Sequence, residues 1–401
     1  MQQLTDFHIQ LTPSLIACLT YACVWLICML RSIGYRRLRN KVQAESAQQA
    51  GQPASISVIL TTQDQCSLLR ERLPLLLQQQ HPDFEVVVVD MKSQDDTLQY
   101  LSDMQLSYPH LRVCSFPPQS KDISAERLAL TLGVRAASKE WVLFTNVSCQ
   151  PASRKTLWLL SSRCTEGKQM VLGYTRYANP KGWTGLRYRF FRTWQQMLNL
   201  THASRYHAYR ASATNLCYRR SFFYEHKGFA DGTPLQNGAT DIMVNRYSTA
   251  QNTAVCLHPD SFMFQDCPNE AHLWNHDRLF FMETRRHLPH HIGYRLRYAG
   301  ASLLTWIHSL SFLATLAAVL LLNHFQLRSL SSQSAVAIPC VLWLVHACWR
   351  TRCFHLTLRA LGEESMNLSL PLLLHLVAKW DLTAWLRHRH TNKNLFRKKF
   401  V

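Results

Sequence analysis

The sequence predicts an α/β protein in which a domain with a mostly parallel sheet is flanked by transmembrane helices. Between residues 52 and 288, short β-rich runs alternate with longer amphipathic segments, which is typical of βαβ units. One run, 84–89, is almost continuously apolar, as expected for a strand that is covered on both faces. On either side of this region lie uncharged stretches of about 20 residues, long enough to cross a bilayer.

The first apolar stretch, residues 11–30, is followed at once by Arg31, Arg36 and Arg37. Basic flanks stay on the cytoplasmic side, so we expect the N-terminus outside and the next domain inside. A cleaved signal peptide is the alternative, but its apolar core would be shorter and would end in a small-residue cleavage site. We therefore predict a transmembrane anchor over 1–31 and a basic juxtamembrane linker over 32–54.

Two further uncharged stretches, 299–322 and 331–349, predict a transmembrane helical hairpin over 291–350. Arg350 and Arg352 follow it, as expected if the chain returns to the cytoplasm. The expected location is the inner or plasma membrane, with several spans and with the main domain, 55–290, in the cytoplasm.

The C-terminal segment, 351–401, contains an apolar run at 368–377 that is too short to span alone. A full crossing near 366–386 would carry the basic tail to the outside. We therefore predict an interfacial or re-entrant helix followed by a cytoplasmic tail.

Charge and cysteine usage exclude two classes of protein. The net charge of +19 lies largely beside the apolar stretches, where it would face anionic headgroups, and no nucleic-acid-binding signature accompanies it. Nucleic acid is therefore not an expected partner. The 13 cysteines include no CxxC pair, which argues against structural zinc and against a disulfide framework.

The central domain divides into strands and helices in alternation. Strands are predicted at 55–61, 84–89, 113–116, 141–145 and 170–174. Helices are predicted at 67–79, 95–107, 124–137 and 152–163, with Ser124 as a helix cap. In an open parallel sheet, ligands bind outside the carboxyl ends of the strands. The polar residues at these ends are Thr61, Thr62, Asp90, Ser93, Asn146 and Ser148.

Four segments in this order resemble the family 2 glycosyltransferases. They are "ISVILTTQDQ", "FEVVVVDMKSQDDT", "ALTLGVRAASKEWVLFTNVSCQP" and "SATNLCYRRSFF". The resemblance covers about residues 55–288 and implies a Rossmann-like domain of the GT-A type that binds a nucleotide sugar. It also implies an acceptor such as a membrane lipid or a lipid-linked glycan.

By this resemblance, Asp90 contacts the base or ribose of the nucleotide, and Thr61 and Ser93 line the same pocket. Arg127 and Lys121 are basic candidates for the diphosphate. The alternative for Asp90 is turn chemistry after a strand, and the alternative for both cations is a solvated helix face.

The position of the family's metal motif departs from the pattern. Family members carry Asp-x-Asp there, because Mg²⁺ or Mn²⁺ bridging a sugar diphosphate needs anionic oxygen ligands. Here the residues are Asn146, Val147 and Ser148, which bring no charge. We therefore assign no certain cofactor, with Mg²⁺ or Mn²⁺ kept as the alternative, and Asn146 and Ser148 have a turn role as their alternative.

The stretch "NGATDIMVN" resembles the segment that supplies the general base, the carboxylate that takes the acceptor's proton. The best register places Ala239 at the usual base and Asp241 on the second acid. A shift by two makes Asp241 the catalytic base. Its alternative role is an acid at a helix N-terminus.

The stretch "FFMETRRHL" resembles the family's Gln-x-x-Arg-Trp-like segment beside the acceptor, with Glu283 in place of Gln. Arg285 and Arg286 would bind phosphate there and replace part of a metal's charge. Contact with lipid headgroups is the alternative with equal weight.

Two functions follow from these observations. The first is an enzyme that transfers a sugar from a nucleotide sugar to a lipid-linked or polysaccharide acceptor at the cytoplasmic leaflet. The second is a catalytically degenerate transferase that acts as a scaffold or regulator, for example of a partner glycosyltransferase. A transporter is disfavoured because the first two spans contain no acidic or basic residue. The distinguishing feature is whether a carboxylate faces the donor sugar.

Overall fold

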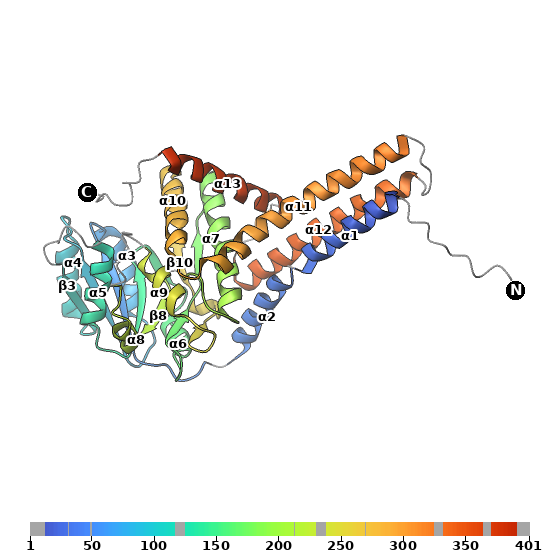
Figure 1. Ribbon diagram of the computed structural model, residues 1–401. Coiled ribbons are helices and arrows are strands. Elements are labelled where there is room, and N and C mark those ends of the chain that lie inside the picture. Colours follow the sequence, from blue (N-terminus) through green and yellow to red (C-terminus); the bar gives the residue numbers. More distant parts are fainter. Residues whose placement is uncertain are drawn as a thin grey trace. The chain divides into compact units, whose positions relative to one another are not determined.

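The computed structural model describes residues 13–30, 32–48, 50–116, 125–211, 213–229, 238–268, 270–324, 332–363 and 370–390 (Figure 1). The chain forms two compact units. The helical unit comprises Met1–Arg37, Arg295–Arg359 and Glu364–Trp380. The α/β unit comprises Leu38–Tyr294, Ala360–Glu363 and Asp381–Val401.

The α/β unit is built on a seven-stranded sheet in the order β3-β2-β1-β4-β8-β6-β9. The strands are β1 Ile56–Thr62, β2 Phe84–Asp90, β3 Leu111–Ser115, β4 Trp141–Asn146, β6 Met170–Leu172, β8 Leu216–Arg219 and β9 Thr253–Val255. Only β8 runs antiparallel to its neighbours β4 and β6. The predicted mostly parallel sheet is confirmed, and its first four strands lie within a few residues of the expected ranges.

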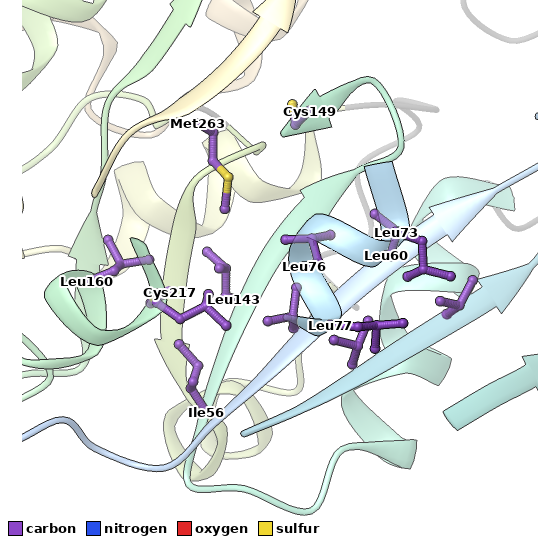
Figure 2. Close-up of a cluster of buried hydrophobic side chains, with 14 of the residues drawn as sticks. Ile56, Leu60, Leu73, Leu76, Leu77, Leu143, Cys149, Leu160, Cys217 and Met263 are labelled. Atoms are coloured by element: carbon purple, nitrogen blue, oxygen red, sulfur yellow. The ribbon is translucent and has the colours of Figure 1, made fainter. Parts of the chain in front are cut away.

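Apolar burial on both faces explains the central strands. Val86, Val87 and Val88 of β2 are fully buried, so successive side chains that point to opposite faces all leave water. Helix α3, Cys66–Leu77, covers one face of this sheet, and Figure 2 shows its leucines gathered beside Leu60 of β1. This packing fixes the central strands on which the candidate site is built.

Helix α5, Ala125–Ala136, lies against β1 and β2 at close range. A Cβ atom on Gly133 would lie 2.4 Å from Cγ2 of Ile59, so glycine is what allows this approach. The predicted cap of the helix, Ser124, lies outside the described residues. The neighbouring helices are α4 Thr97–Ser107 and α6 Thr156–Ser161, the latter shorter than the expected 152–163.

A second sheet, in the order β5-β10-β7, was not predicted. Its strands are β5 Cys149–Pro151, β7 Thr175–Ala178 and β10 Met263–Asp266. The remaining elements of the unit are α7 Gly182–Ala203, α8 Arg220–Glu225, α9 Ala239–Tyr247, the 3₁₀ helix η1 Pro259–Ser261 and α10 Ala271–His287. The strand β5 begins directly after Ser148, so this sheet borders the position of the metal motif.

The predicted linker, 32–54, is mostly a helix. Helix α2, Ile33–Ala47, buries Leu38, Val42 and Glu45. Glu45 accepts a hydrogen bond from the backbone N–H of Leu257 at 2.7 Å and pairs with Arg163 at 3.4 Å. From Leu38 onward, this segment is therefore part of the α/β unit. One face of the helix packs against that unit, although the sequence of the helix is rich in basic residues.

The helical unit is built from α1 Pro13–Leu30, α11 His291–His324, α12 Ser332–Ala360 and α13 Leu370–His390, of which α11 and α13 extend into the α/β unit. Two of the described helical segments, Leu15–Ala47 and Leu296–Leu321, are long and apolar enough to cross a membrane. The hairpin α11–α12 and the helix α13 stand where the sequence predicts helices.

The helical unit exposes large apolar side chains and buries several polar ones beside its apolar core. Leucines such as Leu19, Leu310 and Leu344 are more than one-third exposed, while Thr305, His346 and Arg350 are buried. An exposed apolar surface with polar side chains turned inward suits a lipid environment.

Candidate active site

The strand order brings the predicted site residues together. β1 lies between β2 and β4, and the strand connections lead away in opposite directions from this point. The register pairs Thr62 with Asp90 and Thr61 with Asn146. The carboxyl ends of three neighbouring strands therefore present these side chains at the switch point of the sheet, where α/β proteins bind their ligands.

Asp90 holds the loop that follows β2. Its carboxylate is buried and accepts hydrogen bonds from the backbone N–H and the hydroxyl of Ser93. The Ser93 hydroxyl oxygen accepts in turn from the backbone N–H of Asp64 at 2.9 Å, in the loop after β1. Asp64 completes the link by accepting from the N–H of Gln94 at 2.6 Å.

These contacts cross-link two loops that are about 30 residues apart in sequence. One further bond joins them, because Asp95 accepts from the N–H of Cys66. Hydrogen bonds from Thr97 and Cys66 hold the pKa of Asp95 below its usual range. Asp90 thus fulfils the turn role given as its alternative. Its carboxylate lies at the base of a firmly held double loop at the carboxyl edge.

Thr62 adds an unused polar group to this edge. Its side chain is 1% exposed, and among the described residues its hydroxyl has no hydrogen-bond partner. Buried hydroxyls are normally hydrogen-bonded, so this one is suited to a ligand or a water molecule. Its neighbour Thr61 is half-buried on the same edge.

The residues at the metal-motif position are already engaged with one another. The Ser148 hydroxyl donates to Oδ1 of Asn146 at 2.6 Å and accepts from Nε2 of Gln265 at 3.0 Å. Arg72 of α3 donates to the backbone carbonyl of Ser148 and to Asp266 of β10. Although burial raises it, hydrogen bonds from Asn179 and Arg72 hold the pKa of Asp266 below its usual range.

These residues do not fit a divalent cation. Both first-choice ligands are neutral, each is occupied by a neighbour, and a guanidinium is bonded to the peptide at the same turn. Within the described residues, no group of three or more His, Cys, Asp or Glu side chains is placed to hold a metal ion.

Asp241 lies at the start of α9 in a buried ion pair. Nε of Arg210 donates to its Oδ2 at 2.8 Å, Nη2 donates to the same oxygen, and the N–H of Ala211 donates to Oδ1 at 3.3 Å. Arg210 is held from its other side by the carbonyl oxygen of Phe281 at 3.3 Å. Both carboxylate oxygens are therefore already accepting hydrogen bonds.

Glu126 is a carboxylate that the sequence analysis missed. It lies in the first turn of α5, which begins at the carboxyl edge because the helix runs back after β3. Burial raises its pKa to about 7; Arg127 lowers it and the charge of Asp241 raises it. The sequence does contain a local signal for this residue, because Glu126 directly precedes Arg127, a candidate for binding phosphate.

The remaining predicted basic residues are more scattered. Arg127 is buried in the same turn as Glu126, which places one cation at the carboxyl edge. Lys121 lies outside the described residues. Arg285 and Arg286 lie in the last turns of α10.

Sequence reasoning also missed Arg72, Arg210 and Asp266. All three sit in ion pairs whose partners are distant in the chain, 194 residues apart for Arg72 and Asp266 and 31 for Arg210 and Asp241. A single sequence carries no local signal for such pairs.

An open α/β sheet with polar side chains converging at its switch point is typical of proteins that bind a ligand, often a nucleotide, at that point. The comparisons specify the class further. Residues 57–227 match the family model described as glycosyl transferase family 2. This part of the chain is therefore similar to the family 2 glycosyltransferases, and the α/β unit has a GT-A-like fold.

Two solved structures illustrate what the chain is similar to. The mannosyltransferase PcManGT from Pyrobaculum calidifontis, in complex with GDP-Man and Mn²⁺, is 17% identical over 85% of this chain and 97% of that chain, with a TM-score of 0.46. S. aureus TarS 1–349 in complex with UDP-GlcNAc is 15% identical over 82% and 89%, with a TM-score of 0.40. No curated protein sequence matches the chain.

Proposed function

We propose that this protein transfers a sugar from a nucleoside diphosphate to a lipid-linked or polysaccharide acceptor at the cytoplasmic face of a membrane, without a divalent metal. The observation that carries the proposal is the cross-linked double loop around Asp90 and Ser93, at the switch point of a family 2 domain. It offers a rigid, partly anionic wall suited to the hydroxyl groups of a ribose.

In the proposed reaction, the acceptor oxygen bonds to the anomeric carbon while the bond from that carbon to the diphosphate breaks. The acceptor's proton passes to a carboxylate, and the nucleoside diphosphate leaves. Arg127 is the cation at the carboxyl edge that would offset the leaving charge, with Arg285 and Arg286 as the proposed phosphate contacts from α10.

Two carboxylates are candidates for the base. Asp241 is the residue that family resemblance supplies, but Arg210 and Ala211 occupy its oxygens. Glu126 has a pKa of about 7, which suits a base at neutral pH. We assign proton uptake to Glu126, with Asp241 holding Arg210 and raising the basicity of its neighbour.

The membrane location rests on the helical unit. Its apolar exterior and the two helices long enough to cross a bilayer support a membrane-bound protein. The basic residues after α1 and within α12 support the cytoplasmic side for the α/β unit. An acceptor with a lipid anchor would then meet the enzyme at the membrane surface.

The second candidate function is a degenerate transferase that binds a donor or a partner glycosyltransferase without turnover. It is favoured by the occupied metal-motif residues, Asn146 and Ser148, and by the ion pair at Asp241. Loss of a metal and of a base would each remove several kcal/mol of transition-state stabilisation.

The test uses the full-length protein in detergent with membrane lipid extract as acceptor. UDP- and GDP-sugars are supplied with Mg²⁺, with Mn²⁺ or with EDTA, and released nucleoside diphosphate is measured. We expect turnover that changes less than about twofold on adding EDTA, because no described residues fit a metal. Asp90→Ala should abolish donor binding, whereas Asp103→Ala, an exposed acid on α4, should leave it unchanged.

Two results would overturn the proposal. Donor binding without turnover of any sugar would favour the degenerate transferase. Turnover that requires Mn²⁺ and stops with EDTA would refute the metal-free mechanism.

A further inference from the structure

The interior of the helical unit contains a cluster of polar side chains from three helices. This polar cluster consists of Tyr21 of α1, Thr305 and His308 of α11, and His346 and Arg350 of α12, all at most 3% exposed. The Tyr21 hydroxyl lies 3.1 Å from Nε2 of His308, whose ring centroid lies 3.9 Å from that of His346. Nη1 of Arg350 donates to the Thr305 hydroxyl at 3.2 Å.

The polar cluster has a cation but no anion. The described part of the helical unit contains no Asp or Glu at all, because its two acids, Asp6 and Glu364, lie outside the described residues. Within the described residues, Arg350 has only a neutral hydroxyl as a partner, and its Nε has none. A buried guanidinium without a counter-charge destabilises the folded state, and a bound anion would remove this cost.

A purely structural role for the polar cluster explains less. Polar side chains often join helices within membranes through hydrogen bonds, and the Tyr21–His308 contact is of that kind. Neutral groups suffice for such contacts, however, and a guanidinium adds an uncompensated charge. His346 also leaves Nε2 without a partner in the described structure, so donor capacity exceeds what the helices use.

The surroundings of Arg350 indicate the kind of anion. The helices present apolar side chains outward, including Leu303, Ile307 and Leu344, so the polar cluster is surrounded by an apolar surface. Thr305 lies six residues, about 9 Å of helix, inside the predicted apolar stretch that starts at Ala299. An anion with an apolar tail reaches such a position more readily than a hydrated inorganic ion.

We propose that the polar cluster binds the phosphate group of a long-chain lipid phosphate, which serves as the anionic head of the acceptor. Arg350 would donate to the phosphate oxygens from its planar fork, and His346 would supply a further donor from Nε2, which has no partner among the described residues. The role as acceptor rests on the proposed transferase function. Lipid binding itself does not, since it uses only the helical unit.

The experiment measures lipid binding by native mass spectrometry of the full-length protein in detergent, without any donor present. The probes are farnesyl phosphate, farnesol and inorganic phosphate, with phosphatidylglycerol as a bulk anionic lipid. The test variant is Arg350→Gln, and the matched control is Arg352→Gln, an exposed arginine on the same helix.

We expect farnesyl phosphate to bind in preference to the other three probes. Arg350→Gln should weaken that binding by at least about tenfold, the cost of a lost charged hydrogen bond, whereas Arg352→Gln should change it little. The melting temperature of Arg350→Gln without lipid should be unchanged or raised, because an unpaired buried charge has been removed.

Several outcomes would overturn the inference. Equal binding of farnesol or phosphatidylglycerol would show that no phosphate head of this class is selected, and equal binding of inorganic phosphate would show that no lipid tail is needed. Unchanged lipid binding by Arg350→Gln, with a lowered melting temperature, would make the cluster structural. Failure of the transferase proposal would appear separately, as lack of donor turnover in a protein that still binds farnesyl phosphate.

Discussion

At the scale of single residues, the ion pair with Arg210 complicates the interpretation of any substitution of Asp241. The two side chains form a buried ion pair, 6% and 10% exposed. Removing one partner of such a pair leaves the other charge buried and unpaired, at a cost of about 3–5 kcal/mol. Loss of activity in Asp241→Ala alone would therefore not distinguish a missing base from a damaged fold.

We predict that Asp241→Ala lowers the free energy of unfolding by about that amount and that the double variant Arg210→Met/Asp241→Leu recovers most of it. Thermal unfolding of the full-length protein in detergent provides the measurement. Activity of the recovered double variant then separates the roles, because an inactive but stable protein would return the base assignment to Asp241. A melting temperature for Asp241→Ala equal to that of the wild type would contradict the buried pair.

Glu126 gives a second prediction at this scale, on pH. Burial raises its pKa from 4.5 to about 7, so folding favours the protonated form. The stabilising contribution is therefore fully present below about pH 4.5 and is lost as the pH rises towards 7. The glutamine of Glu126→Gln cannot ionise, so the stability of this variant should not fall for this reason as the pH rises.

The expected result is that Glu126→Gln becomes more stable relative to the wild type between pH 5 and pH 8, by roughly 1–3 kcal/mol. Unfolding curves of both proteins at the two pH values measure the difference. Asp103→Asn, at an exposed position, should show no such trend. If the difference in unfolding free energy between the two proteins stayed constant across this pH range, the Glu126 carboxylate would have to be exposed to solvent.

The sequence predicted the position of some of these residues at the ends of strands, but it did not predict the ion pairs. Thr61, Asp90 and Asn146 were found because each ends an apolar run, and parallel strands align such ends. Arg72 and Arg210 were not found, because an arginine among polar neighbours has the same local pattern whether it is solvated or paired across the fold.

At the scale of elements, the contact between α5 and the sheet depends on one missing side chain. Gly133 leaves its Cα directly over Ile59 and Val89. We predict that Gly133→Ala destabilises the protein by about 1–3 kcal/mol, since a methyl group must displace a well-packed side chain. Thermal unfolding checks this, with Gly51→Ala as control, where the nearest atom to a new Cβ is 3.9 Å away. Equal melting temperatures for both variants would mean that α5 can shift at no cost.

Element prediction succeeded where the hydrophobic pattern is long. Buried strands such as β2 carry seven residues of signal, whereas β5, β9 and β10 have only three or four. Short strands take their structure from neighbours that are distant in sequence, so the second sheet could not be foreseen. Helix α2 was mistaken for a linker because its charged residues outnumber the three that it buries.

At the scale of the whole molecule, the sequence separated the apolar helices from the α/β region, and the chain forms two compact units whose bounds differ from the predicted ones at residues 38–54 and 381–401. Length and lack of charge were enough to locate α1 and α11. They could not reveal the interior of the helical unit, because His308 and His346 become neighbours only through helix packing. The sequence therefore indicated where the bundle lies, while its chemistry depends on the tertiary structure.

The bonds between the loops after β1 and β2 also constrain how the proposed transferase could change. Asp64 and Ser93 each serve both loops, so a substitution in one loop disturbs the other. A new donor preference, whether it arises in evolution or in the laboratory, would then require paired changes rather than single steps. Divergence of donor choice should be slow in this lineage, and intermediates with one altered loop should be poor binders of both the old and the new donor.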